Sequence, residues 1–336
     1  MATKLSDSVL NSGDFEYDFP CTECQERALN SEAIYYCENC TRQFCGLCIK
    51  KHDQFYRGHQ ILGLKKRDAW GKVMATDKQY SLVENKHFKV KLKHDKNSCS
   101  ISGITVLPGG EIVIADSKNR NLMLLSASYT VVGHARVPVG PWEICAVSDK
   151  QVAVGTVGWD IQFFHVQNKQ LKMDRKIQME HKCYYVSYSE GHLYVSSGLT
   201  VYQYTLAGQR VREIYKTDGW TVWGLDVSPD GDRLYLNENN KVMVVDIQGQ
   251  VLLAEFIHDL EGPGGVCVSP SGDVFVCGYR SNTILQVDGE CKRKLATLAT
   301  EKHGVCSPQS VYFDSRTSSL LVGQHDTDDL LVFKLK

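Results

Sequence analysis

The chain of 336 residues is 43% hydrophobic and 23% charged, a composition typical of folded soluble proteins rather than disordered or fibrous ones. Lys and Arg total 38 and Asp and Glu total 39, so the net charge of −1 creates no strong field that would attract nucleic acid or anionic lipid. No run approaches about 18 consecutive apolar residues, and the N-terminus lacks the apolar core of a signal peptide, so we expect a soluble, cytoplasmic protein with no membrane association.

The sequence predicts four segments in chain order. Residues 1–16 are polar and are predicted to be disordered. Residues 17–64 carry six of the thirteen cysteines, and residues 65–86 are polar and charged, which is typical of a linker. Residues 87–336 alternate short apolar runs with Gly, Asp, Asn and Ser, a texture typical of β-strands and tight turns. We therefore expect a mainly β protein with a small cysteine-rich module at its N-terminal side.

The cysteine-rich segment has the spacing of a metal-binding module. Its potential ligands follow the order Cys21-x2-Cys24-x12-Cys37-x2-Cys40-x4-Cys45-x2-Cys48-x3-His52-x6-His59. Six thiols and two imidazoles make two tetrahedral sets with no ligand left over, which predicts two structural zinc ions and no catalytic water. Free buried cysteines and disulfides are the alternatives. Because four residues separate Cys40 from Cys45, the spacing allows either a sequential or an interleaved division of the ligands.

The β-rich segment contains an internal repeat of about 40 residues. Each unit begins with an apolar pair, and the first members of successive pairs lie 40, 42, 39, 41 and 45 residues apart: Ile104, Ile144, Val186, Leu225, Val266 and Val311. A second pair follows each one, at Ile112, Val152, Leu193, Leu234, Val274 and Leu320. Six such units predict a six-bladed β-propeller, with the strand expected at 87–92 completing the last blade and closing the ring. A β-sandwich with coincidental spacing is the alternative.

Loops on one face of such a propeller would bring several aromatic and basic residues together. We expect these residues to be Trp142, Trp159, Trp220, Trp223, Tyr279, Arg280 and His325. Exposed Trp, Tyr and Arg commonly anchor a protein partner, although each of them could instead pack between blades. Residues 85–336 carry 27 basic and 27 acidic residues, so a strong phosphate-binding surface is not expected. A catalytic metal site in the propeller would need more carboxylates at the ring entrance than Glu143 alone.

On these motifs, residues 21–59 resemble a B-box zinc finger of the tripartite-motif superfamily, and the repeats resemble the NHL-type propellers of that superfamily. Gly103–Leu125 comes closest to a family repeat. The resemblance implies that Cys21, Cys24, Cys45 and Cys48 bind one zinc ion and that Cys37, Cys40, His52 and His59 bind the other.

The chain also departs from that superfamily. No Cys or His precedes Cys21, so a RING finger is missing, and the segment between His59 and His87 lacks the heptads of a coiled coil. We therefore expect a monomeric, non-catalytic adaptor that binds protein or peptide partners, in a ubiquitin-pathway or innate-immune setting that the resemblance implies. A ubiquitin ligase acting without a RING and an RNA-binding regulator are the alternatives.

Overall fold

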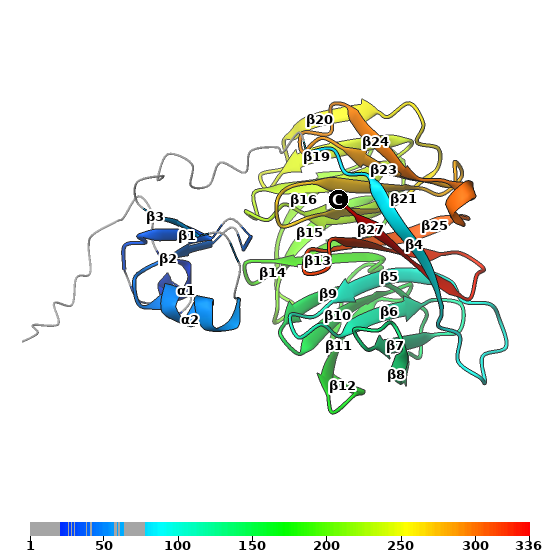
Figure 1. Cartoon of the computed structure of the whole chain (residues 1–336), viewed down its shortest axis with the longest axis horizontal. Coiled ribbons are helices and arrows are strands. Elements are labelled where there is room, and N and C mark those ends of the chain that lie inside the picture. The colour runs from blue at the N-terminus through cyan, green and yellow to red at the C-terminus, as the bar shows by residue number, and fades with distance from the viewer. Residues whose placement is uncertain are drawn as a thin grey trace, which may run out of the picture. The chain divides into compact units, whose positions relative to one another are not determined.

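The computed structural model describes residues 78–336 and residues 21–63, except for positions 26, 28, 30, 38, 41, 57, 58 and 60. The chain divides into two compact units, Met1–Val73 and Met74–Lys336 (Figure 1). The segment predicted to be disordered, 1–16, lies outside the described residues, as do positions 65–77 of the predicted linker.

The N-terminal unit is built from short elements. These are α1 (Thr22–Gln25), β1 (Tyr35–Cys37), β2 (Arg42–Phe44), α2 (Cys48–Phe55) and β3 (Ile61–Gly63). Strands β2 and β3 pair antiparallel with opposite edges of β1. The buried apolar side chains described in this unit form two small groups: Ala33, Tyr36 and Leu62, and Cys37, Phe44 and Ile49. A core of this size needs metal ions or disulfides to hold a domain together.

The C-terminal unit, as far as it is described, forms six four-stranded antiparallel sheets. The first three sheets contain β5 (Ile101–Val106), β6 (Ile112–Asp116), β7 (Asn121–Leu125) and β8 (Val131–Arg136); β9 (Pro141–Ser148), β10 (Gln151–Thr156), β11 (Asp160–Gln167) and β12 (Gln170–Gln178); and β13 (Tyr185–Ser189), β14 (His192–Ser196), β15 (Thr200–Thr205) and β16 (Arg210–Lys216). The next two contain β17 (Val222–Val227), β18 (Arg233–Glu238), β19 (Lys241–Asp246) and β20 (Val251–Phe256); and β21 (Pro263–Val268), β22 (Val274–Gly278), β23 (Thr283–Val287) and β24 (Lys294–Ala299). The 3₁₀ helix η2 (Glu301–His303) leads into the last sheet, which contains β25 (Pro308–Asp314), β26 (Ser319–Gln324), β27 (Asp329–Leu335) and β4 (Leu82–Lys89).

The repeated apolar pairs of the sequence face each other across the first two strands of each sheet. Ile104 pairs with Ile114 in the first sheet, and Val311 pairs with Val322 in the last. The same pairing occurs in the other four sheets. Each repeat of the sequence therefore forms one antiparallel sheet. The apolar pairs of the repeat lie on its first two strands, where most of them are buried.

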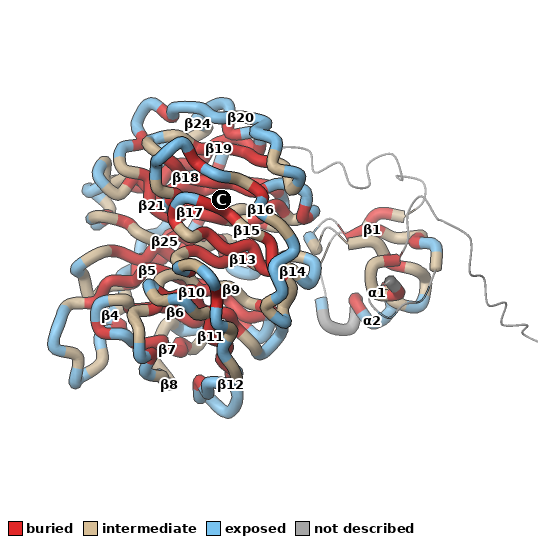
Figure 2. Tube along the Cα trace, turned by 180° about the vertical axis from the view of Figure 1, so that it is seen from behind, coloured by how far each residue is buried: buried red, intermediate tan, exposed pale blue. Residues whose placement is uncertain are grey.

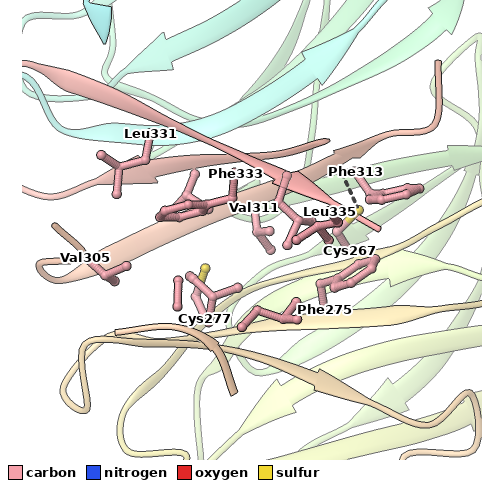
Figure 3. Packing of buried hydrophobic residues seen from close by; sticks show 14 of the residues in the cluster. Cys267, Phe275, Cys277, Val305, Val311, Phe313, Leu331, Phe333 and Leu335 are labelled. Atoms are coloured by element: carbon pink, nitrogen blue, oxygen red, sulfur yellow. Dashed lines mark hydrogen bonds between the residues drawn. The ribbon is translucent and has the colours of Figure 1, made fainter. Parts of the chain in front are cut away.

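The sheets pack face to face in chain order. The first strand of each sheet, from β5 through β9, β13, β17, β21 to β25, contacts the first strand of the next, and β25 contacts β5. Phe275 of β22 stacks on Phe313 of β25 with ring centroids 5.1 Å apart, and Phe333 of β27 joins the same buried cluster (Figure 3). Burial decreases outward, so that most of the outer strand β20 is exposed, whereas every residue of the first strand β5 is buried (Figure 2).

The last sheet is completed by a strand from the start of the unit. That strand is β4, Leu82–Lys89, which pairs with β27 and begins five residues before the predicted strand at 87–92. Tyr80 just before it is buried, and its hydroxyl donates to Asp273 at 3.2 Å. The linker prediction is therefore wrong for residues 78–86. The strand was hidden in the sequence because most of its side chains are exposed, so backbone pairing with β27 holds it rather than apolar alternation.

Candidate metal centres and an aromatic cavity

Four thiols of the N-terminal unit form a first cluster. Cys21 and Cys24 flank the first turn of α1, and Cys45 and Cys48 join β2 to α2. The Cys24 N–H donates to the Cys21 carbonyl at 3.1 Å, so the pair closes a turn that brings both thiols to one side. The Sγ atom of Cys24 lies 3.8 Å from that of Cys45 and 3.7 Å from that of Cys48. All four sulfur atoms lie within 4.8 Å of one another.

Two thiols and two imidazoles form a second cluster. Cys37 ends β1, Cys40 follows in the turn before β2, and His52 lies on α2. The Cys40 Sγ lies 3.2 Å from His52 Nε2 and 3.2 Å from His59 Nδ1, and the Cys37 Sγ lies 3.5 Å from His59 Nδ1. His52 is buried and stacks on Tyr56, which holds its ring in this orientation. The four ligand atoms again lie within 4.8 Å of one another.

Both clusters fit a tetrahedral zinc ion. Zn–S bonds of about 2.3 Å separate two sulfur ligands by about 3.8 Å, and sulfur from imidazole nitrogen by about 3.6 Å. The sulfur–sulfur distances of 3.7 and 3.8 Å match the first value, and the sulfur–nitrogen distances of 3.2 to 3.5 Å are slightly shorter than the second. The clusters divide the ligands in the interleaved order, so the structure groups the same two sets that the resemblance implies. These Cys/His clusters could hold metal ions.

The protonation of the thiols suits metal binding. Hydrogen bonding with the Cys40 side chain lowers the pKa of Cys37 to about 5, and the same contact raises the pKa of Cys40. Burial opposes ionisation of Cys45, but the backbone N–H groups of Cys48 and Leu47 outweigh it and lower the pKa of Cys45 to about 7. One thiol in each cluster is thus ready to ionise near neutral pH, and a bound cation would favour loss of the remaining protons.

A third group of potential ligands, which the sequence analysis did not identify, lies in the C-terminal unit. It consists of Asp95, Cys99 and Asp116. The Asp116 carboxylate accepts hydrogen bonds from the backbone N–H groups of Ser100, Lys118 and Asn119, and Asp95 accepts one from the Asn121 amide. Because these oxygens already satisfy backbone and amide donors, the group organises the loops around β5 and β6.

Six of the seven predicted partner-binding residues line one cavity of about 470 Å³ in the C-terminal unit. We call it the aromatic cavity, and its lining includes Trp142, Trp220, Trp223, Tyr279, Arg280 and His325. Trp220 and Trp223 are 55% and 46% exposed, so both form an open rim. Trp142 instead packs edge-on against Tyr184, with ring centroids 6.2 Å apart. The cavity is therefore partly a packed wall and partly an accessible aromatic surface.

Trp159, the seventh predicted residue, does not line the aromatic cavity. It lies in the turn between β10 and β11 and is 51% exposed, with its backbone carbonyl accepting from the Met179 N–H. The sequence analysis in turn missed Asn239, Asn240 and Gln309, which line the cavity. Asn239 and Asn240 have positive φ angles of 45° and 61°, so the Asn-Asn dipeptide between two apolar runs was the sequence signal that could have predicted a tight turn here.

Among the described residues, no helix has the length and hydropathy needed to cross a membrane. Comparison with protein-family models gives no match for this chain. A search of curated proteins gives no match either.

Proposed function

We propose that the chain is a zinc-dependent, non-catalytic interaction protein, in which a B-box-type finger is tethered to a six-bladed β-propeller of the NHL type. The observation that carries the proposal is the pair of closed four-ligand clusters, one of four thiols and one of two thiols and two imidazoles. Thiolate and imidazole ligands in fours favour zinc over calcium or magnesium, which prefer oxygen.

The ligand count argues for a structural role of the metal. A catalytic zinc ion keeps one position for water or substrate, whereas four protein ligands fill the coordination sphere. Both clusters supply four ligands, so each ion would replace the missing hydrophobic core of the finger. The finger would then serve as a rigid docking surface.

The six four-stranded sheets and their closed order of contacts support a propeller. The loops on one face of a propeller form a ligand surface, and here they contribute the aromatic cavity. A protein with two such surfaces can hold two partners together. The thirteen cysteines carry no disulfide, which suits the reducing cytoplasm in which we place this adaptor.

The proposal is tested with the purified full chain. We expect two zinc ions per monomer and no ubiquitin transfer when the chain is incubated with ubiquitin-activating enzyme and a panel of ubiquitin-conjugating enzymes. Zinc-dependent formation of ubiquitin chains would instead favour the ligase, and fewer than two zinc ions on a folded finger would contradict the metal centres.

A further inference from the structure

The aromatic cavity draws on many parts of the C-terminal unit. Ser102 of β5, Trp142 of β9, Tyr185 of β13, Trp223 of β17 and Gln309 of β25 all line it. Residues far apart in the chain therefore converge on one hollow of about 470 Å³, a size typical of ligand sites.

The permanent charge of the residues that line this cavity is positive. Among the described residues that line it, none carries a carboxylate, while Arg280 supplies a permanent positive charge. The Arg280 stem packs over Gly262, where a Cβ atom would approach its Cγ to 2.6 Å, so the glycine allows this placement. The guanidinium makes no ion pair or side-chain hydrogen bond within the described structure. Asp326 lies 3.7 Å from the Nδ1 atom of His325 and pairs with Lys118 rather than with Arg280.

Two amide side chains of the cavity have their oxygen atoms already engaged. Asn240 Oδ1 accepts the Gly262 N–H at 2.9 Å, and Gln309 Oε1 accepts the Ser100 hydroxyl at 2.7 Å. Their amide nitrogens have no partner among the described residues, and neither do the indole N–H groups of Trp220 and Trp223. Accessible donors without a protein partner, together with an unpaired cation, favour an anionic acceptor, and the aromatic rim favours an apolar group next to it.

We propose that the aromatic cavity binds a peptide segment in which one carboxylate side chain, Asp or Glu, is followed by an aromatic or large aliphatic residue. This proposal rests on the proposed function as an interaction protein and names the chemistry of its partner. The carboxylate pairs with Arg280 and accepts from the amides of Asn240 and Gln309, and the apolar side chain packs on Trp220 and Trp223.

A peptide fits better than the two other classes of ligand. A nucleic acid strand carries a charge at every nucleotide, whereas the cavity has one permanent cation and residues 85–336 have 27 basic against 27 acidic residues. A small metabolite would be enclosed, whereas Trp220 and Trp223 remain 55% and 46% exposed at the rim and offer a surface to a longer chain.

The experiment uses the full chain and capped tetrapeptides of the form Gly-X-Z-Gly, with X as Asp, Glu, Asn, Gln or Lys and Z as Phe, Trp, Leu or Ala. Binding is measured by saturation-transfer NMR and competition. We expect peptides with Asp or Glu before Phe, Trp or Leu to bind about tenfold more tightly than their Asn, Gln, Lys or Ala counterparts.

Three variants locate the effect. Arg280→Gln should remove the preference for Asp over Asn, and Trp223→Ala should weaken both peptides. Trp159→Ala is the matched control, because this tryptophan is 51% exposed but lies outside the cavity lining, and it should leave binding unchanged. Zinc content and thermal unfolding are measured for every variant to show that each is folded.

The proposal is overturned if no peptide binds, or if the preference for Asp survives in Arg280→Gln. It is also overturned if a uridine decamer at about 0.15 M salt binds more tightly than any peptide and loses its affinity in Arg280→Gln. Failure of peptide binding with two zinc ions still bound would reject this cavity assignment alone and leave the zinc-dependent finger intact.

Discussion

The eight candidate metal ligands lie in pairs, and the local backbone explains why. Each C-x2-C spacing places two thiols on one turn, and β1, β2 and α2 then bring a second pair opposite the first. Because only two small groups of apolar side chains are buried around them in the described part of this unit, bonds to the proposed zinc ions would replace a core. Each ligand should therefore matter for folding as well as for binding.

Cys45→Ser should lower the zinc content from two ions to about one per chain and unfold the finger, because three remaining thiols leave an incomplete coordination sphere. The measurement is elemental analysis combined with limited proteolysis. Cys306→Ser is the control, since Cys306 is exposed and belongs to the other unit, and it should retain both ions. A folded Cys45→Ser protein with two zinc ions would refute the assignment.

A partly buried carboxyl group makes stability depend on pH. Glu143 on β9 is half-buried and its Oε1 accepts the Ile144 N–H at 3.0 Å. Burial raises the pKa of Glu143 from 4.5 to about 8, and nearby Asp226 adds to the rise. Between these two values the unfolded chain loses the proton and the folded chain keeps it, so the free energy of unfolding falls as the pH rises and levels off above about 8.

Glu143→Gln should therefore stabilise the C-terminal unit at pH 8 by about 1 to 3 kcal/mol and have little effect at pH 4. Thermal unfolding of both proteins between pH 4 and pH 9 provides the measurement. The account of this carboxyl is wrong if the variant and the parent show the same pH dependence.

At the scale of elements, the inner strands were predictable and the outer ones were less so. Val152 and Val154 are buried because sheets pack on both of their faces, which makes the first two strands of each sheet read as apolar pairs. Strand β4 has one exposed face and charged residues such as Glu84 and Lys86, so its sequence resembles a linker. Tyr80 and Asp273 are far apart in the sequence, and nothing in the sequence showed that they would be in contact.

The candidate metal ligands were predictable from the sequence, whereas the lining of the aromatic cavity was predictable only in part. Residue type and spacing identified all eight candidate ligands, because only Cys and His offer those donor atoms in that pattern. The division of ligands required the resemblance or the structure. The folded backbone decides that Asn239, in a turn, and Gln309, on β25, reach the cavity and that Trp159 does not, and apolar periodicity contains no information about that.

Tyr80 anchors the strand that completes the last sheet, and its removal should show this. Its backbone N–H donates to Gln286 at 2.9 Å, and its ring lies 5.7 Å from that of Phe313. Tyr80→Ala should cost about 3 to 5 kcal/mol of stability in the C-terminal unit, whereas Tyr80→Phe should cost about 1 kcal/mol. Urea unfolding checks both values.

Val83→Ala is the control for that series, because Val83 lies on β4, three residues after Tyr80, but is 56% exposed. It should change the free energy of unfolding by less than about 0.5 kcal/mol. Equal effects of Tyr80→Ala and Val83→Ala would mean that the segment is not anchored.

At the scale of the whole molecule, we expect the two units to depend on different sources of stability. All eight candidate ligands lie in Met1–Val73, while the six four-stranded sheets lie in Met74–Lys336. If the proposed zinc ions are bound, a chelator should unfold the N-terminal unit and leave the thermal transition of the C-terminal unit unchanged within about 1 °C. Calorimetry with and without chelator measures this, and a shift of several degrees in the propeller transition would contradict the independence of the two units.

The most direct test of the account is X-ray absorption at the zinc edge of the purified full chain. Six thiols and two imidazoles shared by two ions predict, on average, three sulfur ligands and one nitrogen ligand per zinc. The bonds should be about 2.3 Å to sulfur and about 2.0 Å to nitrogen. Elemental analysis of the same sample should give two zinc ions per chain. Oxygen ligands in place of sulfur, or fewer than two zinc ions per chain with the N-terminal unit still folded, would contradict the proposed metal centres.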